Sequence, residues 1–183
     1  MKKIPIILTF LRILLSFVFI YFLFNKGLLN LCISIFIFSI AALTDFYDGF
    51  FARKFNVCSN FGKFLDPLAD KVLTNSAFIS FYFLNLINFW IVLVFLIRDL
   101  FMTSFRIFMW KKNIVISASK SGKFKTFFQF IVIYLLFLFI IFNSIGIDSL
   151  FLKKIIDLSV YFVVILTIWS AIKYVLNFKE KIL

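Results

Sequence analysis

Six long apolar runs, separated by short polar breaks, set the pattern of this chain. The runs cover about residues 8–24, 28–51, 59–83, 89–110, 124–142 and 152–174. Each is close to the ~20 residues that an α-helix needs to cross a lipid bilayer. The pattern therefore predicts an all-α integral membrane protein with six transmembrane helices.

The polar breaks alternate in charge. The breaks at 25–27, 84–88 and 143–148 carry little charge, with Lys26 as their one cation and Asp148 as their one acid. The termini, the remaining breaks and the run ends next to them hold 13 of the 20 lysines and arginines, whereas Lys26, Lys153 and Lys154 fall on the opposite side. Because cationic residues collect on the cytoplasmic side of membrane proteins, both termini and the breaks after the second and fourth runs are predicted to be cytoplasmic.

The first residues, Met1-Lys2-Lys3, resemble the start of a signal peptide. Arg12 interrupts the apolar run behind them, and no small-residue cleavage site follows. We therefore expect these residues to be retained as a short interfacial segment, anchored to the cytoplasmic face by Lys2 and Lys3.

Composition narrows the class of protein further. The chain is 64% hydrophobic and 15% charged, which a soluble domain of 183 residues could not accommodate. The net charge of +12 would suggest nucleic-acid binding in a soluble protein, but membrane topology accounts for it here, so no nucleic-acid partner is expected. There is no histidine, which removes histidine bases and ligands, and Cys32 and Cys58 are too far apart for a metal-ligand pair. No repeat or linker is visible, so residues 1–183 are predicted to form one domain.

Four of the eight acidic residues fall between positions 45 and 70. They belong to the pattern Asp45-x2-Asp48-Gly49-x2-Ala52-Arg53-x8-Gly62-x3-Asp66-x3-Asp70. Helical rotation places the members from 45 to 52 within roughly 100° of arc, and Gly62, Asp66 and Asp70 within roughly 80°. Carboxylates at membrane depth are costly and indicate function by default. Four of them on two faces that can converge form an oxygen cage for a hard cation such as Mg²⁺.

Other residues of the pattern refine this interpretation. The small residues Gly49, Ala52 and Gly62 allow a backbone or a flat ligand to approach closely. Pro67 is expected to disfavour regular helix just before it, at Asp66. The alternative is that the aspartates form buried ion pairs, for which the cations would be Arg53, Lys63 and Lys71. Four converging carboxylates repel one another, however, unless an ion of higher charge than lysine lies between them.

The complete pattern resembles the signature of the CDP-alcohol phosphotransferase family. The resemblance implies that Asp45, Asp48 and Asp66 ligate two divalent ions, Mg²⁺ or Mn²⁺. It also implies that Asp70 contributes to one metal site and acts as the general base. The residues implied to line the CDP group of the donor are Asp48, Gly49, Ala52, Arg53 and Gly62. Relatives form homodimers, so a homodimer is expected.

Basic residues in the second half of the chain suggest the kind of acceptor. Arg98 and Arg106 lie about 80° apart around the fourth predicted helix and can face one pocket. Lys123 and Lys125 lie at the start of the fifth predicted helix, where a positive charge is unfavourable beside the positive end of the helix dipole. These four residues predict a site for the phosphate of a phosphorylated acceptor. Lys111, Lys112 and Lys120 are more simply explained as cytoplasmic loop charge.

Segments outside the acidic pattern extend the resemblance over nearly the whole chain. They are Ile4-Pro5-Ile6-Ile7-Leu8-Thr9-Phe10-Leu11-Arg12, Ala69-Asp70-Lys71, Ile97-Arg98-Asp99 and Gly122-Lys123-x-Lys125-Thr126. They resemble the bacterial branch of the family that makes phosphatidylglycerol phosphate, although relatives often carry a polar residue where Ile6 stands. This branch implies CDP-diacylglycerol as donor, glycerol 3-phosphate as acceptor and CMP as the second product. Thr9 and Arg12 are expected at the donor site, with the alternative that Arg12 extends to the membrane interface.

Three alternatives stay open. Within the family, the acceptor could be phosphatidylglycerol, which would give cardiolipin, or an inositol phosphate. A different class of protein is a small divalent-cation channel or transporter with the aspartates as its filter. Against this, all four aspartates lie near one predicted membrane face, and no acidic line continues across.

Overall fold

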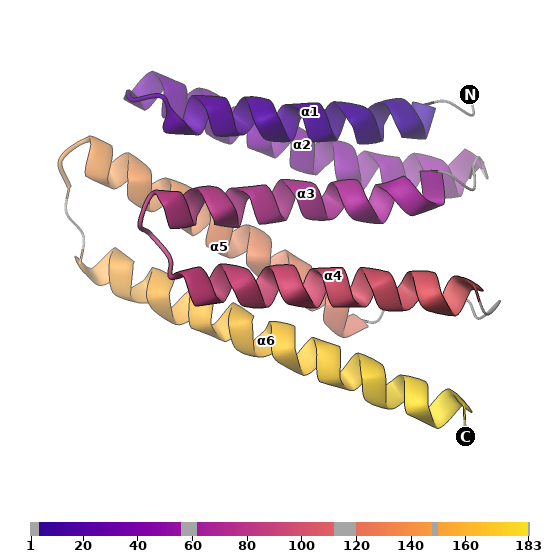
Figure 1. Cartoon of the computed structure of the whole chain (residues 1–183). Coiled ribbons are helices and arrows are strands. Elements are labelled where there is room, and N and C mark those ends of the chain that lie inside the picture. The colour runs from indigo at the N-terminus through magenta and orange to yellow at the C-terminus, as the bar shows by residue number, and fades with distance from the viewer. Residues whose placement is uncertain (1–3, 56–61, 112–119, 148–149, 183) are drawn as a thin grey trace. The chain divides into compact units, whose positions relative to one another are not determined.

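The computed structural model describes residues 4–55, 62–111, 120–147 and 150–182. Within these it describes the side chains of residues 7, 9–44, 71–105, 109, 122–147, 150–174 and 176. The described chain forms six α-helices (Figure 1): α1 (Ile4–Phe24), α2 (Leu28–Phe55), α3 (Gly62–Phe83), α4 (Phe89–Lys111), α5 (Lys120–Ser144) and α6 (Leu150–Ile182). They divide into two compact units, Met1–Ser80 and Phe81–Leu183.

The six helices agree with the six apolar runs, with three differences. α6 continues to Ile182, beyond the predicted end of the sixth run. α1 runs unbroken from Ile4, so no separate interfacial segment precedes it in the described residues, and Lys2 and Lys3 lie outside them. α3 stays one helix through Pro67, so the expected disturbance at Asp66 was wrong. Pro67 is close to the start of α3, where its missing N–H removes only one intrahelical hydrogen bond.

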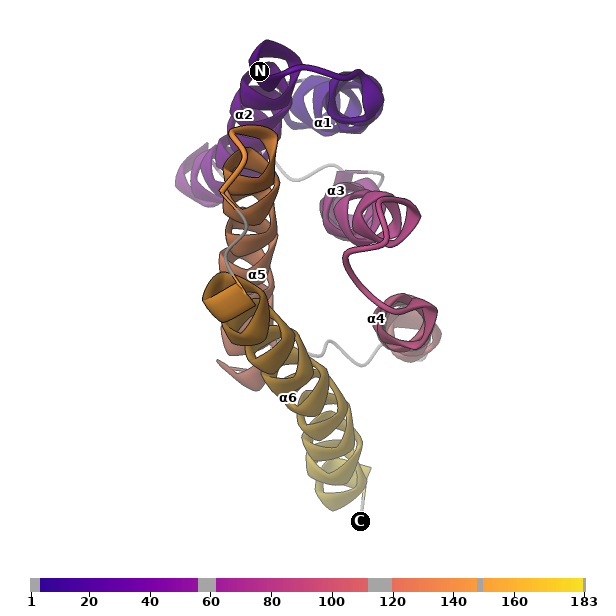
Figure 2. The ribbon, with the colours of Figure 1, turned by 90° about the vertical axis from the view of Figure 1, so that its left-hand side faces the viewer.

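In the first unit, α1 and α2 form an antiparallel hairpin, and they lie side by side in Figures 1 and 2. The chain turns at Gly27, whose φ of 119° is strained for other residues. Ser34 Oγ donates a hydrogen bond across the hairpin to the Phe19 carbonyl oxygen at 3.1 Å. The rings of Phe19 and Phe38 meet edge to face with centroids 5.5 Å apart. These contacts fix which residues of α1 and α2 lie at the same level.

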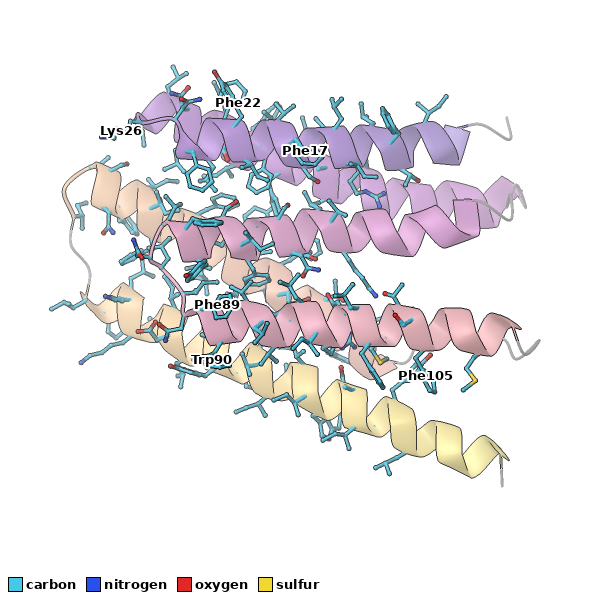
Figure 3. All side chains as sticks on the ribbon, in the orientation of Figure 1. Phe17, Phe22, Lys26, Phe89, Trp90 and Phe105 are labelled. Atoms are coloured by element: carbon cyan, nitrogen blue, oxygen red, sulfur yellow. The ribbon has the colours of Figure 1, made fainter. Side chains whose placement is uncertain are left out.

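The first half of α1 buries its polar side chains and exposes large apolar ones, whereas Phe19 and Leu23 in the second half are buried. Thr9, Arg12 and Ser16 are each 1% exposed, whereas Phe10 is 68% and Phe17 66% exposed. Figure 3 shows the side chains along α1, with Phe17 labelled. This arrangement is the reverse of a water-soluble amphipathic helix. It is suited to a lipid solvent, in which apolar side chains face outward and polar ones are satisfied within the protein.

In the second unit, α6 packs against both α5 and α4. The buried side chains of α6 recur every three or four residues and are Ile156, Val160, Val163, Thr167, Ser170 and Tyr174. The last turn of α3 belongs to this unit, and the Phe81 ring meets that of Phe137 on α5 at 5.2 Å. The polar residues of this buried stripe, Thr167 and Ser170, lie in the second half of α6, where Ser170 contacts Arg98 of α4.

Two helix ends close with the same hydrogen-bond pattern. Asn85 has a φ of 57°, and the N–H of the next residue, Leu86, donates to the Phe81 carbonyl at 3.0 Å. Gly146 has a φ of 77°, and Ile147 donates to Phe142 at 2.9 Å. In each case a residue in the left-handed region allows the chain to satisfy the last helical carbonyls. α3 and α5 therefore end where the sequence predicts uncharged or nearly uncharged breaks.

Among the described residues, two helical segments are long and apolar enough to cross a bilayer: Gly122–Ser144 and Leu150–Tyr174. Thr9–Phe24 and Leu28–Thr44 are shorter apolar stretches. Such apolar helices, together with the outward-facing phenylalanines, are typical of a membrane protein.

Candidate active site

The first half of the acidic pattern continues the interior stripe of α2. Leu31, Ser34, Phe38 and Ala41 are buried at intervals of three and four residues, and the last two are fully buried. Continuing that interval leads to positions 45, 48 and 52. The helix register therefore places Asp45, Asp48 and Ala52 on the face of α2 that is interior one turn earlier. Gly49 lies beside Asp48 on the same face, and Arg53 follows Ala52; the side chains of all five lie outside the described set.

The second half of the pattern occupies the start of α3 in the same way. Asp66 and Asp70 are one turn apart, and the next positions along that face are Thr74 and Ala77. Thr74 is 4% exposed and Ala77 is fully buried. Gly62 is the first residue of the helix. Positions 66 and 70 therefore continue the helix register of Thr74 and Ala77 toward the start of α3, and the side chains of Gly62, Asp66 and Asp70 are outside the described set.

The described side chains themselves contain no cluster of three or more aspartates, glutamates or cysteines that could hold a metal. The candidate ligands are instead the four aspartates of the pattern. Their chemistry fits a hard divalent ion, because they offer only carboxylate oxygens, two from α2 and two from α3.

α1 contributes two buried polar side chains at the level of this pattern. Phe19 contacts Ser34 and Phe38 across the antiparallel hairpin. Counting equal helical rises in opposite directions from that contact brings Arg12 level with about residues 41–45, and Thr9 level with about residues 44–48. Both side chains are 1% exposed. Thr9, expected at the donor site, and Arg12 thus lie inside the protein at the height of Asp45 and Asp48.

A separate cluster of charges lies inside the second unit. Asp99 Oδ1 accepts a hydrogen bond from Arg98 Nη1 at 2.8 Å and another from Lys125 Nζ at 2.7 Å. Arg98 Nη2 donates to Ser170 Oγ at 2.9 Å. The cluster joins α4, α5 and α6 and is buried, with the Lys125 side chain 2% and the Arg98 side chain 13% exposed. Counted over the described side chains alone, two cations and one carboxylate give this cluster one net positive charge.

The four residues predicted to hold the acceptor phosphate are therefore only partly brought together. Arg98 and Lys125 meet through Asp99. Lys123 is exposed, and it makes no hydrogen bond or ion pair with the described residues of this cluster. The Arg106 side chain lies outside the described set, but its position continues the buried stripe of Asp99, Met102 and Met109 on α4.

Sequence reasoning missed two members of this cluster. Asp99 stands next to Arg98 in an apolar run, and that pairing was a signal of a compensated buried charge. Ser170 gave no such signal, because it lies 72 residues from Arg98 and serine is common in membrane helices.

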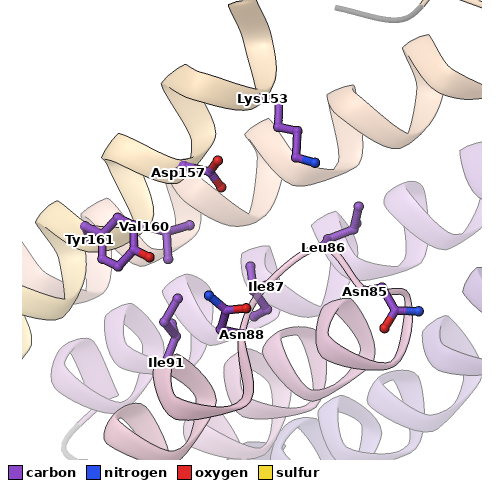
Figure 4. Close-up of a pocket in the computed structure, with 9 residues that line it drawn as sticks. All are labelled: Asn85, Leu86, Ile87, Asn88, Ile91, Lys153, Asp157, Val160 and Tyr161. Atoms are coloured by element: carbon purple, nitrogen blue, oxygen red, sulfur yellow. The ribbon is translucent and has the colours of Figure 1, made fainter. Parts of the chain in front are cut away.

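A surface pocket of about 260 Å³ lies elsewhere in the second unit (Figure 4). It is lined by the loop between α3 and α4 and by the early turns of α6, including Asn88, Lys153, Asp157 and Tyr161. None of the predicted site residues lines it. Along α4, its nearest lining residue, Ile91, is about 10 Å from Arg98 at 1.5 Å per residue.

The amino-acid sequence matches the profile of a known protein family and is similar to several known proteins. The sequence profile described as CDP-alcohol phosphatidyltransferase matches residues 2–172 of the chain. A relative in Mycoplasma genitalium is 36% identical over 80% of this chain, and one in Mycoplasma pneumoniae is 37% identical over 72%. The matches span 64% and 66% of those relatives' own lengths, just under two thirds. A Rickettsia typhi relative is 29% identical over 95% of this chain and 96% of its own length. All three carry the name CDP-diacylglycerol–glycerol-3-phosphate 3-phosphatidyltransferase.

Proposed function

We propose that this chain, which belongs to the CDP-alcohol phosphatidyltransferase family, transfers a phosphatidyl group from CDP-diacylglycerol to glycerol 3-phosphate. The products would be phosphatidylglycerol phosphate and CMP. The observation that carries the proposal is the complete acidic pattern in the sequence, whose two halves fall on α2 and on the start of α3. The names of the relatives support the choice of donor and acceptor.

The family is generally dependent on divalent metal, and the carboxylates of the pattern fit such ions. Asp45, Asp48 and Asp66 would hold two of them, Mg²⁺ or Mn²⁺, with Asp70 contributing to one. When bound, the ions would neutralise the diphosphate of the donor and stabilise the charge that develops on departing CMP. Gly49, Ala52 and Gly62 leave room for the CDP group beside them. Arg53 and Thr9 would hold its polar atoms.

Asp70 is the proposed general base. Its carboxylate accepts the proton of the acceptor hydroxyl as the hydroxyl oxygen attacks the phosphorus that bears diacylglycerol. The bond from that phosphorus to the CMP oxygen breaks, and the electron pair leaves with CMP. The atoms balance with no further reactant, because the donor supplies both the phosphatidyl group and the leaving group.

Arg12 has a supporting role in this proposal. A fully buried guanidinium requires compensating negative charge, since an isolated charge in an apolar interior is strongly disfavoured. The carboxylates level with it on α2 and the diphosphate of the donor both meet that requirement.

The basic residues Arg98, Arg106, Lys123 and Lys125 would bind the phosphate of the acceptor. The cluster of Arg98, Asp99 and Lys125 keeps a net positive charge in a buried place, which suits a phosphorylated alcohol better than a neutral one. This favours glycerol 3-phosphate over phosphatidylglycerol, which would present a neutral glycerol headgroup for cardiolipin synthesis. An inositol phosphate could bind to the same cations, so these residues do not distinguish it from glycerol 3-phosphate.

We place the enzyme in the bacterial cytoplasmic membrane with six spans, α1 to α6. The cations of the termini and of the breaks after α2 and α4 put the acidic pattern on the cytoplasmic side, where CDP-activated lipid and glycerol phosphate are both available. A homodimer is part of the proposal on the basis of the family alone.

An acceptor panel tests the proposed reaction. Purified protein would be incubated with CDP-diacylglycerol, Mg²⁺ and, in turn, glycerol 3-phosphate, phosphatidylglycerol, inositol phosphate and serine, with lipid products read by mass spectrometry. We expect phosphatidylglycerol phosphate from the first mixture alone. Cardiolipin, an inositol phospholipid, or no lipid in any mixture would contradict the assignment, and Mg²⁺ flux into vesicles without lipid synthesis would favour a channel.

A further inference from the structure

The side chain of Arg98 is held in place from two helices. Its Nη1 donates to Asp99 on its own helix, and its Nη2 donates to Ser170 on α6. The Ser170 hydroxyl is itself fixed, because it donates to the Thr167 carbonyl at 3.1 Å and the residue is 1% exposed. With two nitrogens committed, the guanidinium keeps its Nε as a buried donor with no hydrogen-bond partner among the described residues.

A second such donor lies one turn beyond Lys125 on α5. Lys125, Gln129, Val132 and Leu136 form one buried stripe, so Gln129 is about 6 Å from Lys125 along the helix. Gln129 is 2% exposed, and within the described chain its Nε2 finds no hydrogen-bond partner. A glutamine at this position has no packing advantage over leucine or methionine.

An unpaired buried amide lowers the stability of a fold, because its hydrogen bonds to water are lost and not replaced. Such a group in an otherwise well-packed helix stripe indicates a partner that is present only in the working protein. Both unpaired groups here are donors, and both adjoin a cluster with net positive charge. Their partner must therefore be rich in oxygen acceptors and negatively charged, which describes a small phosphorylated polyol.

We propose that Gln129 is a specificity-determining residue of the acceptor site, whose side-chain amide donates a hydrogen bond to an oxygen of the phosphorylated alcohol bound between Arg98 and Lys125. Asp99 and Ser170 are positioning residues that hold the two cations for it. This inference rests on the proposed function, since the ligand is the acceptor of that reaction.

The test is Gln129→Met, which keeps the length of the side chain and removes its donor. The KM for glycerol 3-phosphate is expected to rise roughly 3- to 10-fold, the size of one hydrogen bond, while the KM for CDP-diacylglycerol stays unchanged. The melting temperature without ligand should stay the same or rise, because an unpaired buried amide has been removed. The increase in melting temperature that glycerol 3-phosphate alone gives the wild-type protein should become smaller in the variant at the same concentration.

Thr167→Val is the matched control. Thr167 is fully buried on α6 and its hydroxyl donates within its own helix to Val163 at 2.7 Å. Removing this satisfied hydroxyl should leave the KM for glycerol 3-phosphate unchanged. Ser170→Ala, in contrast, should raise that KM, and Ser170→Thr, which keeps the hydroxyl, should restore it at least in part.

Failure of this inference can be told apart from failure of the proposed function. If wild-type protein neither binds nor uses glycerol 3-phosphate, the proposed function fails. Suppose instead that wild-type protein both binds and uses glycerol 3-phosphate. Gln129 is then not an acceptor ligand if Gln129→Met leaves the KM for glycerol 3-phosphate unchanged, or if the variant raises the KM values of both substrates equally. A lower melting temperature with unchanged KM would make Gln129 a structural residue.

Discussion

By helix register, Asp45 and Asp48 follow the buried residues Phe38 and Ala41 on α2, and Asp66 lies two turns before Thr74 on α3. We expect Asp45→Asn, Asp48→Asn and Asp66→Asn each to abolish phosphatidyl transfer, because a neutral amide is a poor ligand for Mg²⁺ and leaves the diphosphate charge unbalanced. Turnover would be measured with and without EDTA, followed by added Mg²⁺ or Mn²⁺.

Asp157→Asn is the control for these variants. Asp157 is exposed near the start of α6 and lines the separate pocket of Figure 4. It should retain wild-type turnover. Full activity of any of the three motif variants, or of wild-type protein stripped with EDTA, would rule out the two-metal proposal.

Asp70 differs from the other aspartates because its main proposed role is to accept a proton. Asp70→Asn should lower kcat by about 10²- to 10⁴-fold, since a general base acts in the transition state. Binding of CDP-diacylglycerol, followed with a fluorescent donor analogue, should survive in part. If Asp70→Asn loses donor binding as completely as Asp48→Asn, its role is mainly that of a metal ligand.

At the residue scale, the sequence identified candidate functional side chains more successfully than it identified their hydrogen-bond partners on other helices. Arg98 and Lys125 were predicted, together with Arg106 and Lys123, to bind the acceptor phosphate, and the structure brings Arg98 and Lys125 together through Asp99. Their shared carboxylate, Asp99, and the link to Ser170 depend on how α4, α5 and α6 are rotated about their axes. Spacing along one helix carries no information on that rotation, so Gln129 and Ser170 were not found.

At the scale of the helices, the apolar runs predicted all six elements because each run is long and ends at a polar break. The extension of α6 to Ile182 was missed because Asn177, Lys179, Glu180 and Lys181 look like the end of a membrane span. They are good or neutral helix formers with no glycine or proline among them, so a helix can continue into water.

α1 gives a prediction at the same scale. Its interior face carries Arg12 at the level of Asp45, and its outer face carries exposed phenylalanines. Arg12→Gln should raise the KM for CDP-diacylglycerol by tenfold or more, since a charge-assisted hydrogen bond contributes roughly 1.5–3 kcal/mol. The KM for glycerol 3-phosphate should change much less.

The control is Ser16→Ala, one turn away on the same buried face, where the hydroxyl donates only to the Arg12 carbonyl at 2.8 Å. Equal effects of Arg12→Gln and Ser16→Ala on the donor KM would show that the face as a whole, and not the guanidinium, is required.

At the scale of the whole molecule, the distribution of cations predicts which ends of the helices face the cytoplasm. In a protein with Cys32 and Cys58 replaced by serine, a cysteine at Asn113 should react with membrane-impermeant maleimide only from the cytoplasmic side. A cysteine at Asn143, which is exposed at the end of α5, should react only from outside. Inside-out and right-side-out vesicles would be compared. The reverse labelling would remove the acidic pattern from the cytoplasmic face.

The central claim is that the phosphatidyl group moves intact from CDP-diacylglycerol to glycerol 3-phosphate. Its most direct test uses a donor labelled with ³²P in the phosphate that bears diacylglycerol. With wild-type protein, glycerol 3-phosphate and Mg²⁺, the label should appear in phosphatidylglycerol phosphate, with one unlabelled CMP released for each lipid formed, and Asp48→Asn should give neither. Label recovered in a water-soluble nucleotide, or product formation that does not depend on glycerol 3-phosphate, would contradict the claim.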